Sequence, residues 1–539
     1  DGKSLAFVRR VNNKSTLFVM DLRSGMPRAV YGGLERDMQE TWALHGVYPG
    51  MAWTPDSKEM VLWAAGELRR VDMASGEATN IPFHVNDTRT VQDALRFPVA
   101  VAPESFPVKA LRQLKVSPAG DRVVYQALGH LWIRNLPDGT PKRLTTQTEH
   151  FEFYPSFSRN GEYIVYATYD DVELGSLRMV PASGGASTTL SSDPGHYTNP
   201  VFTPDGSQVV YSKGGYITSP LWSFEPGLYR ISVKGGEPTL ITRSGSGPQF
   251  TDSSERVYLS SASGGKRTLI SIGLDGKDQR THLESANATE FALSPDGNWV
   301  AFAERFNAYV APFVQTGSPV NIGPGTKSIP VHRVTRDAGE NLQWSGDSKG
   351  LNWSLGPELY SRTLSDSFVF LDGAPEELPE APMEGLNVSF DQPHAAPTGW
   401  LALVGARIIT MRGDEVIEEG TILIEGNRIR TVGSMDDIKV PAGARVIDAF
   451  GTTIIPGIVD VHYHGSTVSG GLMPESNWVH QANLAFGVTT VHDPSHNTND
   501  IFAAAELAKA GGIVAPRMFS TGTILYGAMG SFKAEIDSL

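Results

Sequence analysis

Leu293-Ser-Pro-Asp-Gly297, followed by Val300-Ala-Phe302, is the clearest copy of a unit that recurs through the first two thirds of this 539-residue sequence. Each copy has an apolar residue, a Ser/Thr-Pro-Asp-Gly-like turn, and then a short strand of β-branched and aromatic residues. Proline presets such a turn, and glycine accepts the positive φ that it needs. The Ser or Thr of the turn falls at positions 54, 117, 158, 203, 251, 294 and 345. A period of about 40 to 50 residues with several strands per unit is typical of a β-propeller.

The extent of the repeat sets the predicted fold class. A second strand pattern accompanies the turn, as in Leu131-Trp-Ile-Arg-Asn-Leu-Pro-Asp-Gly139, and it alternates like a half-buried strand. The first residues, Asp1-Gly2-Lys3 before Leu5-Ala-Phe-Val8, match the second half of the turn and its strand. We therefore predict an all-β propeller of seven or eight blades over residues 1–365, with an incomplete first blade and an insertion at about residues 84–114. These repeats resemble the TolB-type, or PD40, branch of WD40-like propellers.

The sequence changes character after residue 365. Residues 366–400 are rich in proline, glycine and acidic residues and are predicted to be a linker. Residues 401–453 contain short strand patterns, with Gly426-Asn427 as a tight hairpin turn. This part is predicted to be a small β module, a short β-sandwich segment.

A pair of histidines closes the next strand pattern, Ile454-Ile-Pro-Gly-Ile-Val-Asp-Val-His-Tyr-His-Gly465. His462 and His464 are two residues apart, and alternate residues of a strand share a face. Both imidazoles can therefore reach one ion, and imidazole is a common ligand for zinc and similar metals. The spacing predicts a metal-binding pair, although two exposed polar residues at a strand end would show the same spacing.

The order of the surrounding motifs resembles that of the amidohydrolase superfamily. The β module comes first, then the Pro-Gly-x-x-Asp-x-His-x-His run, then Gly487-Val-Thr-Thr-Val-His-Asp493. The resemblance is nearest to imidazolonepropionase-like and prolidase-like members. It implies that residues 454–539 begin a metal-dependent (β/α)₈ barrel and that His462 and His464 bind a divalent metal, zinc being favoured, in a site of one or two ions. The local patterns predict helices and strands in turn, over residues 476–486 (helix), 487–492 (strand), 501–510 (helix) and 516–525 (strand).

Other polar residues of this region receive weaker assignments. His480 falls on a predicted helix and is expected to be a surface or packing residue. His492 and Asp493 end the second predicted strand, where a structural role or a supporting role beside the metal fits. His496 receives no role, and Thr521 and Thr523 lie near the predicted barrel mouth by position only.

The implied reaction is hydrolysis of a C–N bond in an amide, a cyclic amide or a short peptide by a metal-activated water. The family pattern also needs a lysine or glutamate, two histidines and an aspartate on later strands, which do not follow here. A barrel takes about 250 residues, so the sequence is expected to be a fragment cut at both ends, with weak or no activity by itself. Two alternatives stay open. One is a propeller-type peptidase of the prolyl oligopeptidase class, whose Gly-x-Ser-x-Gly elbow is not found. The other is a TolB-like propeller that binds a protein without catalysis.

Composition limits the partners. The sequence is 40% hydrophobic and 19% charged, which is globular, and its formal net charge of −14 argues against a nucleic-acid partner. It has no cysteine, which excludes thiol catalysis and cysteine-bound zinc. No apolar run reaches the 18 residues of a membrane span. We expect a small-molecule or short-peptide substrate and a periplasmic or secreted protein whose signal peptide would precede residue 1; the oligomeric state stays open.

Overall fold

The computed structural model describes residues 2–11, 14–34, 50–93, 98–214, 225–465, 467–468 and 471–525. Its contacts divide the chain into two compact units, Asp1–Val99 and Ala100–Leu539. No helix among the described residues is long and apolar enough to cross a membrane.

The first unit consists of two antiparallel sheets. Leu17, Met60 and Val71 are buried in the core that these sheets share. The strands of one sheet are β1 (Ser4–Val11), β2 (Lys14–Asp21) and β3 (Pro27–Tyr31), and those of the other are β4 (Ala52–Trp53), β5 (Glu59–Ala64), β6 (Glu67–Asp72) and β7 (Ala78–Asn80).

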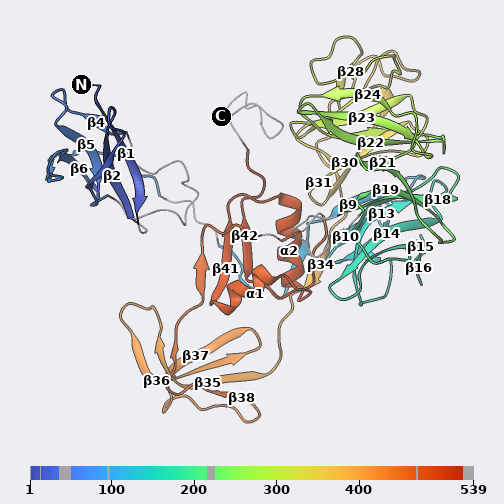
Figure 1. Ribbon diagram of the computed structural model, residues 1–539. Helices are drawn as coiled ribbons and strands as arrows, with labels where there is room; N and C mark the ends of the chain where they lie inside the picture. Colours follow the sequence, from blue (N-terminus) through green and yellow to red (C-terminus); the bar gives the residue numbers. More distant parts are fainter. Residues whose placement is uncertain are drawn as a thin grey trace. The chain divides into compact units, whose positions relative to one another are not determined.

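Within the described residues, six sheets of the second unit follow the sequence repeat (Figure 1); all their strand pairs are antiparallel except β24 and β28, which pair in parallel. The strands of the first three are β9 (Arg112–Val116), β10 (Arg122–Ala127), β11 (His130–Asn135), β12 (Lys142–Arg143); β13 (Phe151–Phe157), β14 (Tyr163–Asp170), β15 (Leu174–Pro181), β16 (Thr188–Thr189); and β17 (Tyr197–Phe202), β18 (Gln208–Lys213), β19 (Gly227–Ser232), β20 (Thr239–Thr242). Those of the last three are β21 (Ser246–Gln249), β22 (Arg256–Ser263), β23 (Lys266–Gly273), β24 (Arg280–Ser285), β28 (Val320–Asn321); β25 (Ala288–Leu293), β26 (Trp299–Glu304), β27 (Asn307–Pro312), β29 (His332–Arg333); and β30 (Glu340–Trp344), β31 (Gly350–Leu355), β32 (Glu358–Thr363), β33 (Leu386–Asn387).

The repeated turn joins the first and second strands of each sheet, and its hydroxyl explains why Ser or Thr recurs there. Thr203 donates to the carboxylate of Asp205 at 2.6 Å and accepts from the backbone N–H of Gln208 at 3.1 Å. This bond from Thr203 is the main reason why the pKa of Asp205 lies below its ordinary value. The turns that begin at Ser294 and Ser345 are held by the same pair of bonds. The positive φ expected of glycine in this turn is confirmed at Gly206 (69°) and Gly297 (71°), and Ser348 adopts it at the same place in the turn of Ser345 (62°).

The six sheets close into a ring through their first strands, which is the arrangement of a β-propeller. Polar side chains on these strands reach the backbone of the neighbouring strand, as Gln113 does when it accepts from the N–H of Tyr154 at 2.6 Å. The closing contact joins the last sheet to the first. Gln343 of β30 accepts from the N–H of Val116 in β9 at 2.8 Å and donates to its carbonyl at 2.7 Å.

This closure differs from the predicted single propeller of seven or eight blades over residues 1–365. The ring of the second unit is complete with six sheets among the described residues, because β30 bonds directly to β9. The two sheets before residue 99 belong to the other compact unit. The predicted linker also contains structure: β33 completes the last sheet, and β34 (Phe390–Pro393) pairs with β8 (Ser105–Val108), which lies in the predicted insertion.

The small β module has the strands that its sequence predicts. Gly426 has a φ of 58° in the tight turn between β36 and β37, where a left-handed residue is needed. The core of the module contains Ala406, Ile408 and Ile422. Its strands are β35 (Trp400–Ile409), β36 (Val416–Glu425), β37 (Arg428–Ser434), β38 (Arg445–Asp448) and β39 (Thr453–Ile454), and both β38 and β39 pair in parallel with β35.

The segment after the module alternates strands and helices, as predicted. Its strands form a parallel sheet in the order β40-β41-β42. The elements are β40 (Ile458–Asp460), α1 (Trp478–Ala485), β41 (Val488–Asp493), α2 (Thr498–Lys509) and β42 (Arg517–Ser520). We call residues 458–520 the βα segment. Residues 526–539, the rest of the predicted barrel part, lie outside the described residues.

Candidate metal centre

The structure brings the two predicted metal ligands together just beyond the end of β40. His462 and His464 are both exposed, whereas Tyr463 between them is buried. The centroids of the two imidazole rings are 5.0 Å apart, and the ring planes meet at 65°. The alternation expected from the sequence therefore holds: both imidazoles lie on one face, open to solvent.

Backbone hydrogen bonds hold this turn in place. The N–H of His462 donates to Oδ1 of Asp460 at 3.0 Å. The N–H of Tyr463 donates to the carbonyl of His492 at 3.0 Å, which ties the histidine pair to the end of β41. The backbone carbonyl of His492 thus has a structural role.

Asp493, the last residue of β41, lies directly beside His464. Its side chain is 1% exposed, and its Oδ1 lies 3.5 Å from Nδ1 of His464. The same carboxylate accepts from the N–H of Ser495 at 2.9 Å, and the Ser495 hydroxyl is 3.3 Å from Nδ1 of His464. A carboxylate near one ring nitrogen favours the tautomer with its proton there, which leaves the other nitrogen free to bind a metal.

The donor types at this turn match part of the ligand set of a metal site. Two imidazoles and a carboxylate beside one of them suit zinc, but a catalytic zinc normally has three protein ligands and an open position. Within the ranges that the structure describes, no group of three or more His, Asp or Glu side chains could hold a metal ion. His462 and His464 therefore fit as two ligands, and a third donor is needed to complete the site.

Tyr463 is a residue of this site that the sequence reasoning missed. Burial, together with the nearby carboxylates of Asp493 and Asp460, raises the pKa of its phenol to about 12. Among the described residues, its hydroxyl has no hydrogen-bond partner. The alternation that placed both histidines on one face also placed Tyr463 on the other, and that signal could have identified it as the buried anchor.

The remaining residues singled out in the sequence have structural contacts. His480 is 1% exposed, neither of its ring nitrogens is hydrogen-bonded to any residue that the structure describes, and burial lowers its pKa to about 4. It is a packing residue. His496 contacts the Thr467 hydroxyl at 3.2 Å. Thr521 donates to the carbonyl of Pro494 at 2.7 Å, so it supports the loop after β41. The hydroxyl of Thr523 lies 3.0 Å from that of Thr498, at the start of α2.

Helix α2 connects the βα segment to the propeller ring. The carboxylate of Glu506, 9% exposed, accepts from the backbone N–H groups of Lys109 and Ala110 at 3.0 and 3.1 Å. Arg112, the first residue of β9, donates to Asp500 of α2 at 3.1 Å. No local sequence pattern predicts these bonds, because the two partners of each bond are hundreds of residues apart in the sequence.

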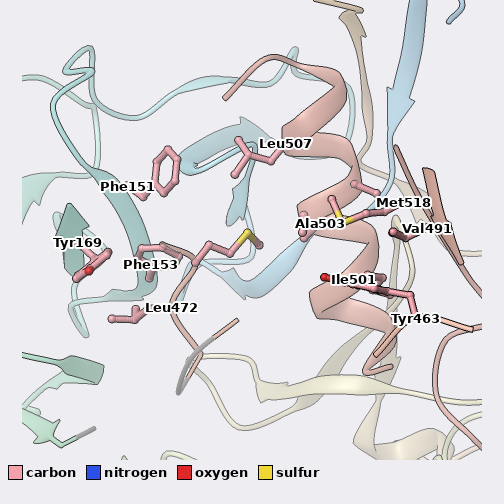
Figure 2. Packing of buried hydrophobic residues seen from close by; sticks show 13 residues of the cluster. Phe151, Phe153, Tyr169, Tyr463, Leu472, Val491, Ile501, Ala503, Leu507 and Met518 are labelled. Atoms are coloured by element: carbon pink, nitrogen blue, oxygen red, sulfur yellow. The ribbon is translucent and has the colours of Figure 1, made fainter. Parts of the chain in front are cut away.

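An apolar cluster, shown in Figure 2, also joins the ring to the βα segment. Phe151 and Phe153 of β13 and Tyr169 of β14 belong to the same buried cluster as Leu507 and Ile501 of α2. Tyr463 is part of this cluster too, together with Val491 and Met518. The turn that holds the histidine pair is therefore anchored in a core to which the ring and the βα segment both contribute.

The chain is similar to several curated proteins over part of its length. It is 40% identical over 67 residues to a 5-methylthioadenosine/S-adenosylhomocysteine deaminase from Symbiobacterium thermophilum, covering 12% of this chain and 15% of the relative. It is 28% identical over 145 residues to a dihydroorotase from Geobacter metallireducens, covering 26% and 33%. It is 42% identical over 64 residues to an imidazolonepropionase from Alkaliphilus metalliredigens, covering 11% and 15%. The chain thus spans a third or less of these relatives, which are enzymes of the amidohydrolase type.

Among solved structures, the chain is similar to two TolB proteins. The TolB from Agrobacterium tumefaciens matches with a TM-score of 0.29 and 18% identity, covering 56% of this chain and 99% of that one. The TolB from Acinetobacter baumannii matches with a TM-score of 0.30 and 13% identity, covering 57% and 76%. No family model matches the sequence.

Proposed function

We propose that the βα segment is the beginning of a metal-dependent (β/α)₈ barrel of the amidohydrolase type, in which His462 and His464 bind a divalent metal, zinc being favoured. Parallel strands that alternate with helices support this assignment. The position of the histidines also supports it, because functional residues of such barrels lie at the carboxyl ends of the strands. The partial similarity to a deaminase, a dihydroorotase and an imidazolonepropionase points to the same class.

The observation that carries the proposal is the paired imidazoles, 5.0 Å apart on one exposed face, with the buried Asp493 beside His464. The proposed reaction is hydrolysis of a C–N bond in a small amide, a cyclic amide or a short peptide. A bound divalent metal would supply a hydroxide from water and polarise the carbonyl under attack. The chain's own residues orient the ligands: Asp493 orients His464 through Nδ1, and Asp460 holds the backbone of His462.

The remainder of the proposal concerns the propeller and the cellular location. We assign the ring the task of binding or gating a small-molecule or short-peptide substrate. A periplasmic or secreted location fits the absence of cysteine from the sequence.

Zinc binding tests the site without relying on turnover. Titration of the metal-free chain with Zn²⁺ against a chromophoric chelator should show a site that His462→Ala and His464→Ala each abolish. Asp493→Asn should weaken it about 10- to 100-fold, the usual cost of losing a carboxylate behind a metal-binding histidine. The matched control is His84→Ala, which removes an exposed histidine elsewhere. Unchanged zinc affinity in the double variant His462→Ala/His464→Ala would refute the assignment.

A further inference from the structure

The ring has a cavity at the end opposite α2. Two residues of α2 contact the starts of inner strands: Asn499 donates to Glu340, the first residue of β30, and Asp500 accepts from Arg112, the first residue of β9. The cavity is lined instead by residues at the ends of the first strands of the sheets, including Phe157, Phe202, Phe250 and Trp344. We call it the axial cavity; its volume is about 230 Å³. It is therefore separate from the histidine pair.

The axial cavity has a cation in its lining. Lys115 of β9 is half-buried and belongs to the cavity wall. Its electrostatic partner is Glu290 of β25, and burial lowers the pKa of Lys115 while it raises that of Glu290 to about 7. One carboxylate oxygen of Glu290 already accepts from the N–H of Leu342 at 3.0 Å. Lys115 belongs to the cavity wall, so its ammonium donors can serve a ligand.

Several other polar groups of the wall already have partners in the ring: the guanidinium of Arg159 donates to the carbonyl of Thr251 at 2.8 Å and lies 3.4 Å from the carboxylate of Asp252. Gln343 bonds to both backbone groups of Val116, and Gln249 accepts from the N–H of Leu293 at 2.8 Å. The indole N–H of Trp344 donates to the carbonyl of Ala292. Lys115 therefore stands among aromatic and proline side chains as the cation open to a ligand, which suits an anion carried on an apolar group.

A second cavity extends the first. Its volume is about 720 Å³, within the range of about 300–1,000 Å³ that ligand pockets have. It shares Arg159, Phe202 and Pro204 with the axial cavity and continues along Tyr163 and Met179. We call it the lateral groove. A ligand whose charged end reaches Lys115 can therefore place an extended body in this groove.

We infer that the axial cavity binds the carboxylate of an apolar ligand, either the C-terminus of a short peptide or a small organic acid, through an ion pair with Lys115. The body of the ligand lies against Phe202 and extends into the lateral groove. The inference does not rest on the proposed hydrolase, because the cavity and the histidine pair share no residue.

Calorimetric titration of the full chain with three probes tests this inference. The probes are N-acetyl-Ala-Pro-Phe with a free carboxylate, the same peptide as its C-terminal amide, and 3-phenylpropionate. The free acid should bind about tenfold or more tightly than the amide, since a hydrogen-bonded charge is lost in the amide. 3-Phenylpropionate distinguishes the two kinds of ligand. If it binds about as tightly as the peptide acid, the cavity takes a small organic acid; if it binds clearly more weakly, the cavity takes the C-terminus of a peptide.

Two variants should act in opposite directions. Lys115→Met should weaken binding of the acid about tenfold or more and leave the amide unaffected, and Glu290→Gln should tighten binding of the acid because it removes a competing carboxylate. The double variant Lys115→Met/Glu290→Gln leaves no unpaired charge in the cavity and should bind the acid as weakly as Lys115→Met. Lys142→Met, at an exposed lysine of β12, is the matched control.

Equal affinity for acid and amide, wild-type affinity in Lys115→Met, or no binding of any probe would overturn the inference. His462→Ala should bind the peptide acid like the wild type. Failure of the zinc test and failure of this one are therefore distinguishable.

Discussion

The propeller ring and the βα segment use similar apolar strands but bury them to different extents. Leu131 in β11 is 0% exposed, and so is Val300 in β26. In β40, by contrast, Ile458 is 48% exposed and Val459 is 56% exposed. Each sheet of the ring packs against sheets on both sides, whereas β40 pairs only with β41 among the described strands. An apolar strand thus stabilises the fold in proportion to the apolar area that neighbouring elements cover, and not in proportion to the number of apolar residues it contains.

The two regions also differ in how they satisfy polar groups. In the ring, inner-strand side chains such as Gln343 bond to the backbone of the next sheet. In the βα segment, the two histidines are exposed, and a buried carboxylate stands behind one of them. The ring uses polar groups to close a structure, and the segment leaves polar groups available for a ligand.

Truncation of one apolar side chain in each region should give the largest difference. Leu131→Ala removes a fully buried side chain that packs with Val124 and Tyr166, and it should cost about 2–5 kcal/mol. Ile458→Ala, at a half-exposed position, should cost less than about 1 kcal/mol. Urea unfolding followed by hydrogen exchange at each strand measures both. Equal losses of unfolding free energy in the two variants would show that the apolar side chains of β40 are buried in solution.

Acid should destabilise the folded protein through His480, the buried histidine of the βα segment. Burial lowers the pKa of His480 to about 4, against an unfolded value of about 6.5. The unfolded chain therefore binds more protons between these values, so the free energy of unfolding falls as the pH falls from about 6.5 to about 4, by up to about 3 kcal/mol.

His480→Leu should remove this part of the pH dependence, and His84→Leu, at an exposed site, should not. Hydrogen exchange of the α1 amides at pH 7 and pH 5, corrected for the intrinsic rates, is the measurement. An unchanged pH dependence in His480→Leu would show that its ring is hydrated or hydrogen-bonded in the folded protein.

Loss of the closing contact should weaken the ring without touching its apolar core. Gln343→Leu leaves the N–H and carbonyl of Val116 without their partner, at a cost of about 1–3 kcal/mol. Hydrogen exchange of β9 and β30 should rise first, because these strands meet there. Gln279→Leu, at an exposed position, is the control. If protection falls evenly over all six sheets, closure is shared around the ring and is not concentrated at Gln343.

The smallest expected effect concerns one turn of the repeat. Thr203→Val keeps the shape of the side chain but removes the bonds to Asp205 and to the N–H of Gln208, at a cost of about 1 kcal/mol. The carboxyl pKa of Asp205, measured by NMR, should rise in this variant because the Thr203 bond is what mainly lowers it. Thr239→Val, at an exposed threonine, should change neither quantity.

Much of the local structure could be predicted from the sequence, and so could the histidine pair. The predicted helices correspond to α1 and α2, and the strand pattern ending at His462 and His464 does place both rings on one face. The number of sheets in the ring could not be predicted in this way, because the repeat before residue 99 is as good a match as the later copies. The contact of Glu506 with Lys109 and Ala110 could not be predicted either, since these residues belong to no common sequence motif.

The sequence by itself determined the turns, the strands and the spacing of the histidines, because each depends on residues within a few positions of one another. Only the tertiary structure decided which sheets close the ring, where α2 contacts it, and that Lys115 interacts with the charge of Glu290. These features depend on side chains that reach the backbone or an opposite charge across hundreds of residues. A contact of that kind is selected by packing geometry, and no local pattern encodes it.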